Sequence, residues 1–518
     1  MKQLFSNQAC RLVLSLCCAG IAAPAVAETV WITIDAGTAA KLKNAPYQVA
    51  DRQSLMTSLG IANLAPEHQL PVLASIDEQD ISILSGQIHQ QLHRCGGFIA
   101  HNSLAEAMNA TANPVSLAVF TPPPLTQGTL VNAMLPMLNN SSIAQTITDL
   151  SAFTNRYYTT TSGKNSADWI ASQWTSLVSG RSWATVSRVA HTGYNQQSVM
   201  LEFVGSDFPN EIVVLGGHLD SINQSGTTET ARAPGADDDA SGIATLTDII
   251  RVMASQNLRP KRTIRFYGYA AEEVGLRGSK DIATAAASAG KQVIGVMQLD
   301  MTNYKGGVDD IVLMTDYTNT SLNAYVQSLI STYQPSLKQS TDVCGYGCSD
   351  HASWHNAGYA AVMPFEAKFN SSNPKIHSVN DTLANSDQTA AHALKFAKLG
   401  LSFALELGNS TGTTPPPPTG ASGEFTNLAA AKGSWVYKTI VVPTGAKSLQ
   451  INMSGGTGDA DMYVRQGANP TTTTYACRPY KTGNTESCTL TNPVAGNWIV
   501  GVRAYSAFSG VKVVWSQQ

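Results

Sequence analysis

Apolar runs and amphipathic stretches alternate through the middle of the sequence. EIVVLGG, TIRFYGYAA and VIGVMQLD are short apolar runs, and GIATLTDIIRVMAS and GSKDIATAAASAG between them have helical patterns. Continuous apolar runs indicate strands buried on both faces, and their alternation with helices is typical of an α/β sheet covered on both sides. We predict a mixed, mostly parallel sheet with helices on both faces over residues 122–409.

The pattern changes beyond residue 423. Short strand-like runs such as WVYKTIVVP, SLQINMSG and NWIVGVRAY follow one another with turn residues between them. This spacing predicts an antiparallel β-sandwich over residues 424–518. Before it stands GNSTGTTPPPPTGASG, whose Pro, Thr and Gly content is typical of an extended linker, which we assign to residues 410–423.

The first residues have the features of a secretory signal. Lys2 and Arg11 precede an apolar stretch over residues 12–23, and a small-residue Ala-Val-Ala motif ends at Ala27. The stretch is shorter than the roughly 20 residues that a membrane-spanning helix needs. We predict a signal peptide over residues 1–27, a secreted protein and no membrane span.

The segment after the signal ends at a strong structure breaker. Residues 28–121 mix strand-like and helical patterns and finish in TPPPLTQG, where three consecutive prolines cannot continue a regular element. We predict a pro-segment that is removed after export. An ordinary N-terminal domain is the alternative, because sequence alone does not show cleavage.

The predicted export bears on the pairing of the cysteines. Of eight cysteines, three lie in the signal, and the exported chain keeps Cys95, Cys344, Cys348, Cys477 and Cys488. In an oxidising compartment the close pairs Cys344/Cys348 and Cys477/Cys488 are the natural disulfides, and Cys95 is left over. Buried thiols or soft metal ligands are the alternative for the first pair.

Length and charge narrow the function classes. At roughly 150 residues per domain, 518 residues suggest three or four units. A net charge of -3, from 33 Lys and Arg against 36 Asp and Glu, leaves no basic excess for a nucleic-acid partner. With 43% hydrophobic and 13% charged residues, the chain can form a packed core under a largely uncharged polar surface, which excludes disorder over most of its length.

Acidic residues and a histidine stand where the predicted strands end. These residues are His218, Asp220, the triplet Asp237–Asp239, Glu272, Glu273 and Asp300. Singly, such residues are typical of surface pairs, helix caps and solvated turns. Ligands, however, bind at the carboxyl ends of strands in an open α/β sheet, and like charges gathered there repel unless cations neutralise them.

The motifs around these residues resemble a known family. HLDS with APGADDDASG, AAEEVGLRGS, QLDMTNY, CGYGCSDHASW and NPKIHSVNDTL, in this order, are similar to the secreted two-zinc bacterial leucyl aminopeptidases. The resemblance implies two Zn²⁺ ions that share a bridging aspartate. One ion would bind His218, Asp300 and Asp238, and the other Glu273, His377 and Asp238. Each keeps a position for water and substrate, as a catalytic zinc site requires, and a bridging hydroxide would be the nucleophile.

Two further carboxylates have implied roles beside the metals. By the same resemblance, Asp220 accepts a hydrogen bond from the second imidazole nitrogen of His218 and sets its tautomer. Glu272 is the general base that takes the water proton and passes it to the leaving amine. The implied activity is release of N-terminal residues, preferably Leu and other apolar ones, from peptides with a free N-terminus. We expect a monomer.

The resemblance also implies an apolar pocket beside the metals. Its candidate lining residues are Met301, Tyr346, Met363, Phe365, Phe369 and Ile376, with the Cys344–Cys348 bridge as one wall. Burying an apolar side chain gains roughly 1.5 to 3 kcal/mol, which favours Leu, Phe and Met. Plain core packing is the alternative for several of these residues.

Other sites and functions have weaker support. His351 and His355 have the spacing of a zincin pair but lack the Glu that should follow the first His, so we expect structural histidines. GDADMYVRQG and GNWIVGVRAY resemble the pre-peptidase C-terminal domain; Asp459 and Asp461 there suit a turn better than a calcium site. A metallocarboxypeptidase, a glutaminyl cyclase and a non-catalytic peptide-binding protein remain the rival functions.

Overall fold

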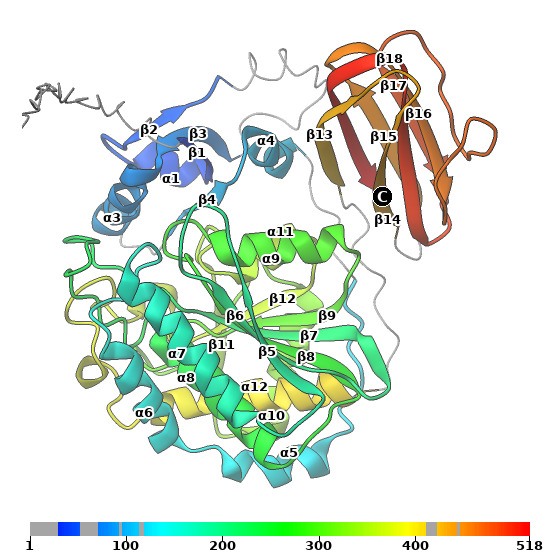
Figure 1. Ribbon diagram of the computed structural model, residues 1–518. Helices are drawn as coiled ribbons and strands as arrows, with labels where there is room; N and C mark the ends of the chain where they lie inside the picture. The colour runs from blue at the N-terminus through cyan, green and yellow to red at the C-terminus, as the bar shows by residue number, and fades with distance from the viewer. Residues whose placement is uncertain are drawn as a thin grey trace, which may run out of the picture.

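The computed structural model describes residues 29–51, 71–92, 96–112, 119–410, 422–442 and 446–517. They form an N-terminal unit (residues 29–112), a central unit (119–410) and a C-terminal unit (422–517), shown in Figure 1. The predicted signal peptide, Cys95 and most of the predicted linker lie outside the described residues. Within the described ranges, every helix falls short of the combined length and apolar character that a bilayer crossing requires.

The central unit is built on an eight-stranded sheet with the order β11-β10-β12-β9-β7-β8-β6-β5. The strands are β5 (Ala184–Val189), β6 (Ser198–Phe203), β7 (Phe208–His218), β8 (Arg262–Tyr269), β9 (Gln292–Gln298), β10 (Ile311–Met314), β11 (Gln339–Asp342) and β12 (Ala361–Phe365). The inner strands β12, β9, β7 and β8 are parallel to one another, whereas the β5/β6, β6/β8 and β10/β12 pairs are antiparallel. The predicted mixed sheet is confirmed.

Helices cover both faces of this sheet because successive strand residues point to opposite sides. On β7, Val213 and Leu215 belong to one hydrophobic core, and Ile212 and Val214 to the core on the other face. The helices are α5 (Gly128–Met134), α6 (Asn140–Ser151), α7 (Thr161–Leu177), α8 (Ala240–Ser255), α9 (Arg277–Ser288), α10 (Thr320–Tyr333), α11 (His351–Asn356) and α12 (Ala391–Asn409). Residues of α8 and α12 fill the first core, and residues of α9 and α11 the second.

The N-terminal unit has a small antiparallel sheet of its own, in the order β2-β3-β1-β4. Its elements are β1 (Thr29–Ile34), α1 (Ala36–Lys41), β2 (Tyr47–Val49), β3 (Val72–Asp77), the short 3-10 helix η2 (Glu78–Asp80), α3 (Ile81–Leu92), β4 (Phe98–His101) and α4 (Leu104–Ala112). Figure 1 shows this unit lying against one end of the central unit. Its apolar side chains share a core with residues of that unit.

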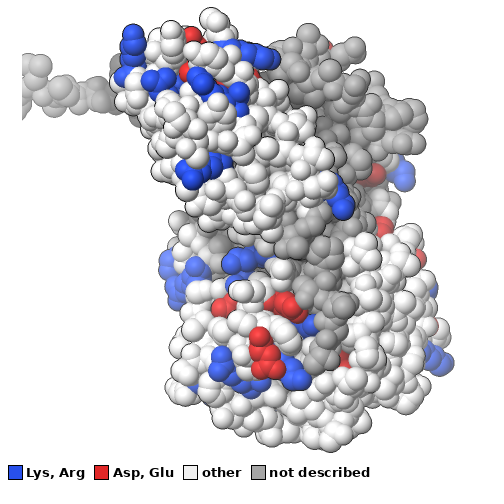
Figure 2. All heavy atoms as spheres, turned by 90° about the vertical axis from the view of Figure 1, so that its right-hand side faces the viewer, with Lys and Arg blue, Asp and Glu red and all other residues white. Residues whose placement is uncertain are grey.

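The C-terminal unit is the predicted antiparallel β-sandwich. It contains β13 (Ser422–Ala430), β14 (Trp435–Val442), β15 (Ser448–Ser454), β16 (Thr457–Gln466), β17 (Glu486–Thr491) and β18 (Gly496–Gln517). The long strand β18 pairs with β13 and β15 along one part and with β14 and β16 along another, so one strand joins both layers. Figure 2 shows mostly uncharged residues on the surface turned to the viewer, in agreement with the composition.

Both predicted disulfides are present. Cys344 is bonded to Cys348 in the central unit, and Cys477 to Cys488 in the C-terminal unit. The second bond links β17 to a loop residue that pairs with Val464 of β16. The disulfide therefore links the long loop after β16 covalently to strand β17 of the sandwich.

Candidate metal centre and active site

Three neighbouring strands deliver the candidate site residues to one edge of the sheet. β7 ends at His218, β8 ends three residues before Glu272, and β9 ends two residues before Asp300. β7 pairs in parallel with both β8 and β9, so their carboxyl ends lie side by side. The loop before α8 adds Asp238, and the chain after β12 adds His377.

Two groups of potential metal ligands are present, His218, Asp239 and Asp300 in the first and Asp238, Glu273 and His377 in the second, and Asp238 also contacts His218. One carboxylate oxygen of Asp238 lies 3.0 Å from Nε2 of His218, and the other lies 3.0 Å from Nε2 of His377. Asp300 completes the first group at 3.5 Å from His218, and Glu273 the second at 2.8 Å from His377. The five residues predicted as ligands are thus brought together, with Asp238 between two histidines.

Burial and missing hydrogen bonds show that this arrangement suits cations. Asp238, Glu273 and Asp300 are at most 5% exposed. Among the described residues, Oε1 of Glu273 and Oδ1 of Asp300 have no hydrogen-bond partner, and Oδ2 of Asp238 has Nε2 of His377 at 3.0 Å. Buried carboxylates without partners are costly unless a positive charge neutralises them. Imidazole nitrogen and carboxylate oxygen form a donor set that fits zinc.

Asp239 also lies within reach of the first group but serves another purpose. Its side-chain oxygens accept hydrogen bonds from the main-chain N–H groups of His218 at 2.9 Å, Gly242 at 2.9 Å and Met301 at 3.2 Å. It caps α8 and ties the loops after β7 and β9 to that helix. We therefore assign it to positioning the ligands, although it is close enough to His218 and Asp300 to coordinate an ion.

The predicted contact from Asp220 to His218 takes a different form. Nδ1 of His218 lies 3.1 Å from the main-chain oxygen of Asp220 and 3.5 Å from its Oδ1. The carboxylate instead accepts hydrogen bonds from the main-chain N–H groups of Glu272 at 2.9 Å and Glu273 at 3.1 Å. Asp220 therefore holds the β8 loop in place, and its carbonyl is the nearer acceptor for the imidazole.

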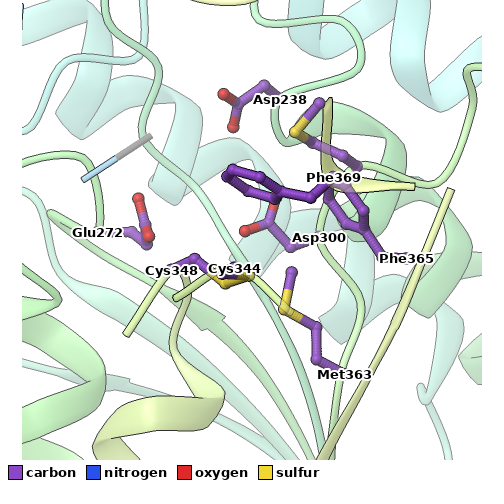
Figure 3. A pocket seen from close by; sticks show the side chains of 9 residues that line it. Asp238, Glu272, Asp300, Cys344, Cys348, Met363, Phe365 and Phe369 are labelled. Carbon is purple, nitrogen blue, oxygen red and sulfur yellow. A yellow bond between two sulfur atoms is a disulfide. The ribbon is translucent and has the colours of Figure 1, made fainter. Parts of the chain in front are cut away.

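Glu272 faces the same cavity as the ligands. Its side chain is 4% exposed and lines the cavity together with Asp238 and Asp300, as Figure 3 shows. Burial raises the pKa of Glu272 well above its ordinary value; His218 opposes this rise, and Asp350 adds to it. A carboxyl group in such surroundings holds a proton more readily than an exposed one, which suits a residue that must accept a proton during a reaction.

Comparison with known proteins identifies the family. Residues 198–401, which contain all five candidate ligands, match peptidase family M28. Leucine aminopeptidase 1 of Trichophyton equinum is 36% identical over 316 residues, which cover 58% of this chain and 83% of the relative. A probable aminopeptidase of Saccharomyces cerevisiae is 30% identical over 372 residues, which cover 69% of this chain and 98% of the relative. The chain belongs to peptidase family M28.

A second family model and two solved structures match further parts of the chain. Residues 436–504 match the bacterial pre-peptidase C-terminal domain, as predicted. The LapA aminopeptidase of Legionella pneumophila has a TM-score of 0.61 and 26% identity, covering 74% of this chain and 99% of its own. LapB of the same organism has a TM-score of 0.60 and 27% identity, and the match covers 74% of this chain and 100% of LapB. M28 membership confirms the predicted metallo-aminopeptidase class, and the M28 unit is metal-dependent.

The candidate substrate pocket is a sulfur-rich and aromatic cavity next to the M28 metal centre. Met301, Met363, Phe365, Phe369 and the Cys344–Cys348 bridge line it together with the acidic residues (Figure 3). Tyr346 and Ile376 pack in the same apolar cluster without lining the cavity. The cavity therefore combines apolar and acidic lining residues.

The other candidate ligands do not gather around a common point. Among the described residues, His351 and His355 belong to no group of three potential ligands, and neither do Asp459 and Asp461. His351 is fully buried in α11, and Asp459 accepts a hydrogen bond from the main-chain N–H of Gly483 at 2.9 Å. The hydrogen bond of Asp459 fits the turn role expected of it, and the structural role of His351 and His355 stays a prediction.

Sequence reasoning missed Arg156, which is 1% exposed and lies behind the metal centre. Its guanidinium donates to the main-chain oxygens of Leu219 at 2.8 Å, Pro234 at 2.6 Å and Gly235 at 2.8 Å. The first oxygen follows His218, and the other two precede the acidic triplet. Arg156 thus joins two ligand-bearing loops, and no pattern in its own neighbourhood indicates this.

Asp381 and Ser349 were also missed. The two carboxylate oxygens of Asp381 accept hydrogen bonds from the main-chain N–H groups of Asp237 at 3.0 Å and Asp238 at 3.1 Å. Ser349 donates its hydroxyl to Oδ2 of Asp300 at 2.6 Å. Both lie inside quoted motifs, NPKIHSVNDTL and CGYGCSDHASW, so their motifs were the available signal.

Proposed function

We propose that this M28 peptidase is an exported, two-zinc aminopeptidase that removes Leu and other apolar residues from the N-terminus of peptides. The observation that carries the proposal is a cavity lined both by apolar side chains and by Asp238, Glu272 and Asp300. The Met, Phe and disulfide side chains would contact an apolar first residue of a substrate, and the carboxylates would attract its free ammonium group. The leucine aminopeptidase names of the fungal relatives support this substrate class.

The chain's own residues supply positioning and proton transfer. His218, Asp238, Asp300, Glu273 and His377 would hold two zinc ions, whose chemistry when bound is Lewis acidity. Glu272 would take the proton of the attacking water at its carboxylate and give it to the leaving amine. The hydrogen bonds from its main chain to Asp220 keep this carboxylate beside the ligands.

The rival functions have less support from the cavity. A carboxypeptidase needs a cation for the terminal carboxylate of its substrate, and the described residues that line the cavity include no Lys or Arg. A glutaminyl cyclase resembling this fold works with one zinc, whereas two ligand groups are present. A non-catalytic binding protein would have no need of the buried Glu272.

The decisive assay compares Leu-p-nitroanilide with its N-acetylated form. We expect hydrolysis of the free-amine substrate alone, its loss with a chelator, and its recovery when zinc is added back. Metal analysis of the active protein should give two zinc ions per chain. Equal hydrolysis of the blocked substrate would contradict an aminopeptidase, and chelator-resistant activity would contradict the metal requirement.

Export and processing complete the proposal. The pattern of residues 1–27 supports secretion through a signal peptide. The contacts of the N-terminal unit support its role as a pro-segment, because the ring of His89 on α3 lies 4.9 Å from the ring of His377. An ion pair from Lys280 to Glu106 and a hydrogen bond from Asn102 to Asp281 hold the unit on α9.

Cleavage before the central unit should therefore activate the enzyme. We expect a specific protease site placed between Pro124 and Leu125 to raise kcat/KM at least about tenfold after cutting, because the N-terminal unit no longer stands over His377. The control is a protein that carries a scrambled site at the same position and therefore stays uncut when treated with the same protease. An unchanged kcat/KM after complete cutting and separation would show that the N-terminal unit is an ordinary domain.

A further inference from the structure

The N-terminal unit buries a face of the central unit that adjoins Glu272. We define this covered face by Tyr157, Tyr158, Tyr194, Ile222, Val274 and Arg277. Its apolar members pack in one cluster with β1, β3, β4 and α3. Ala271, which directly precedes Glu272, belongs to the same cluster, and the main-chain N–H of Ala100 donates to the oxygen of Gly275 at 3.0 Å.

A carboxylate occupies the one strongly charged point of the covered face. Oε1 of Glu78, in η2, accepts hydrogen bonds from Nη1 of Arg277 and from the hydroxyl of Tyr158, both at 2.6 Å. The Arg277 guanidinium also lies 5.6 Å from the ring of Tyr158 and 5.0 Å from that of Tyr194. Arg277 is 7% exposed, so this is a built site for a carboxylate, flanked by aromatic rings.

Loss of the N-terminal unit leaves this site without its acidic partner. Within the described residues, Glu78 is the acidic side chain that forms an ion pair with Arg277. Without that unit the guanidinium becomes accessible, and its contacts with the rings of Tyr158 and Tyr194 would hold it ready for a charge-assisted hydrogen bond with a new carboxylate. Arg277 is also fixed at the first position of α9, directly after the loop that carries Glu272 and Glu273.

The covered face adjoins the site, because α3 contacts His377 and β4 contacts the loop that carries Glu272. A peptide whose first residue fills the apolar cavity has its scissile bond beside Glu272 and the metal ligands. A substrate that extends from the site on this side would meet the surface that the N-terminal unit covers. The pro-segment and the downstream part of the substrate therefore compete for one surface.

We propose that the covered face binds the substrate downstream of the scissile bond, and that Arg277 and Tyr158 bind a substrate carboxylate where Glu78 lies in the unprocessed chain. The preferred substrates are then peptides with an apolar first residue and a carboxylate farther along, either an acidic side chain or the C-terminal carboxylate of a short peptide. This inference rests on the proposed aminopeptidase function and on removal of the N-terminal unit.

A peptide series on the processed enzyme tests the inference. Each peptide begins with Leu and carries Glu or Gln at one of positions two to five, with the C-terminus free or amidated. We expect one position at which Glu exceeds Gln by about tenfold in kcat/KM, mainly through KM, with a smaller difference at high salt. A preference that follows the free C-terminus at one peptide length would assign the site to that carboxylate.

Variants separate the site from general charge effects. Arg277→Gln should reduce the Glu-to-Gln ratio to about one, and Arg265→Gln, which removes an arginine paired with Glu202 on β6, should leave the ratio unchanged. If Arg277→Gln does not fold, the Glu/Gln peptide series on the enzyme without substitutions still tests whether a substrate carboxylate is preferred. Equal cleavage of all peptides overturns this inference alone, whereas no cleavage of any Leu peptide overturns it together with the proposed function.

Discussion

Replacing Glu272 by Gln should lower kcat for Leu-p-nitroanilide by roughly 10²- to 10⁴-fold while the bound metal stays at its normal level. Gln has the shape of Glu but cannot accept the proton of the attacking water. Glu272 belongs to neither group of potential ligands, so its replacement removes no metal donor. Steady-state kinetics together with metal analysis of the purified variant measure the two effects separately.

The adjacent residue provides the matched control. Glu273→Gln removes a donor that lies 2.8 Å from His377, so this variant should lose metal as well as activity. Added zinc should restore part of the activity of Glu273→Gln and none of that of Glu272→Gln. A Glu272→Gln enzyme with near-normal kcat would remove Glu272 from the mechanism, and one without metal would show that its role is coordination.

Replacing Arg156 by Met should destabilise the protein by about 3–5 kcal/mol and weaken zinc binding by roughly 10- to 100-fold. Met keeps most of the side-chain volume but leaves the main-chain oxygens of Leu219, Pro234 and Gly235 without their buried donor. Both loops that these oxygens anchor carry metal ligands. Denaturant unfolding and zinc titration of the metal-free protein measure the two losses.

Arg232 is the control for this substitution. Its guanidinium also bonds main-chain oxygens, those of Ser151 and Phe153, but at an exposed position. Water can replace these bonds, so Arg232→Met should cause a much smaller loss of stability and none in zinc affinity. Equal effects of the two substitutions would mean that Arg156 contributes only general packing.

The site residues that the sequence could predict share a physical property. His218, Glu272, Glu273 and Asp300 follow continuous apolar runs, and such runs indicate buried parallel strands whose carboxyl ends meet. The sheet, its two helical layers and the β-sandwich were predicted from the same local patterns. Assignment of individual ligands, however, depended on the resemblance of whole motifs to a family.

Contacts between distant segments could not be predicted in this way. Arg156 bonds carbonyls more than sixty residues away, and a carbonyl is the same group in every residue type. Asp220 was expected to use its carboxylate on His218; Oδ1 lies 3.5 Å from Nδ1, and the carboxylate also accepts the N–H groups of Glu272 and Glu273, which the sequence did not indicate. The packing of the N-terminal unit over the site also depends on three-dimensional surfaces, which the pattern of a single segment does not contain.

The spread of the candidate ligands along the chain, from His218 to His377, couples ion binding to the stability of the fold. The ligands follow β7, β8, β9 and β12 and precede α8, so any opening that separates these segments also separates the donors. The unfolded chain has no preformed donor set. Ions bound only to the folded state would add stability that grows with the logarithm of their free concentration above the dissociation constant. A chelator would then lower the thermal stability of the enzyme as well as its activity.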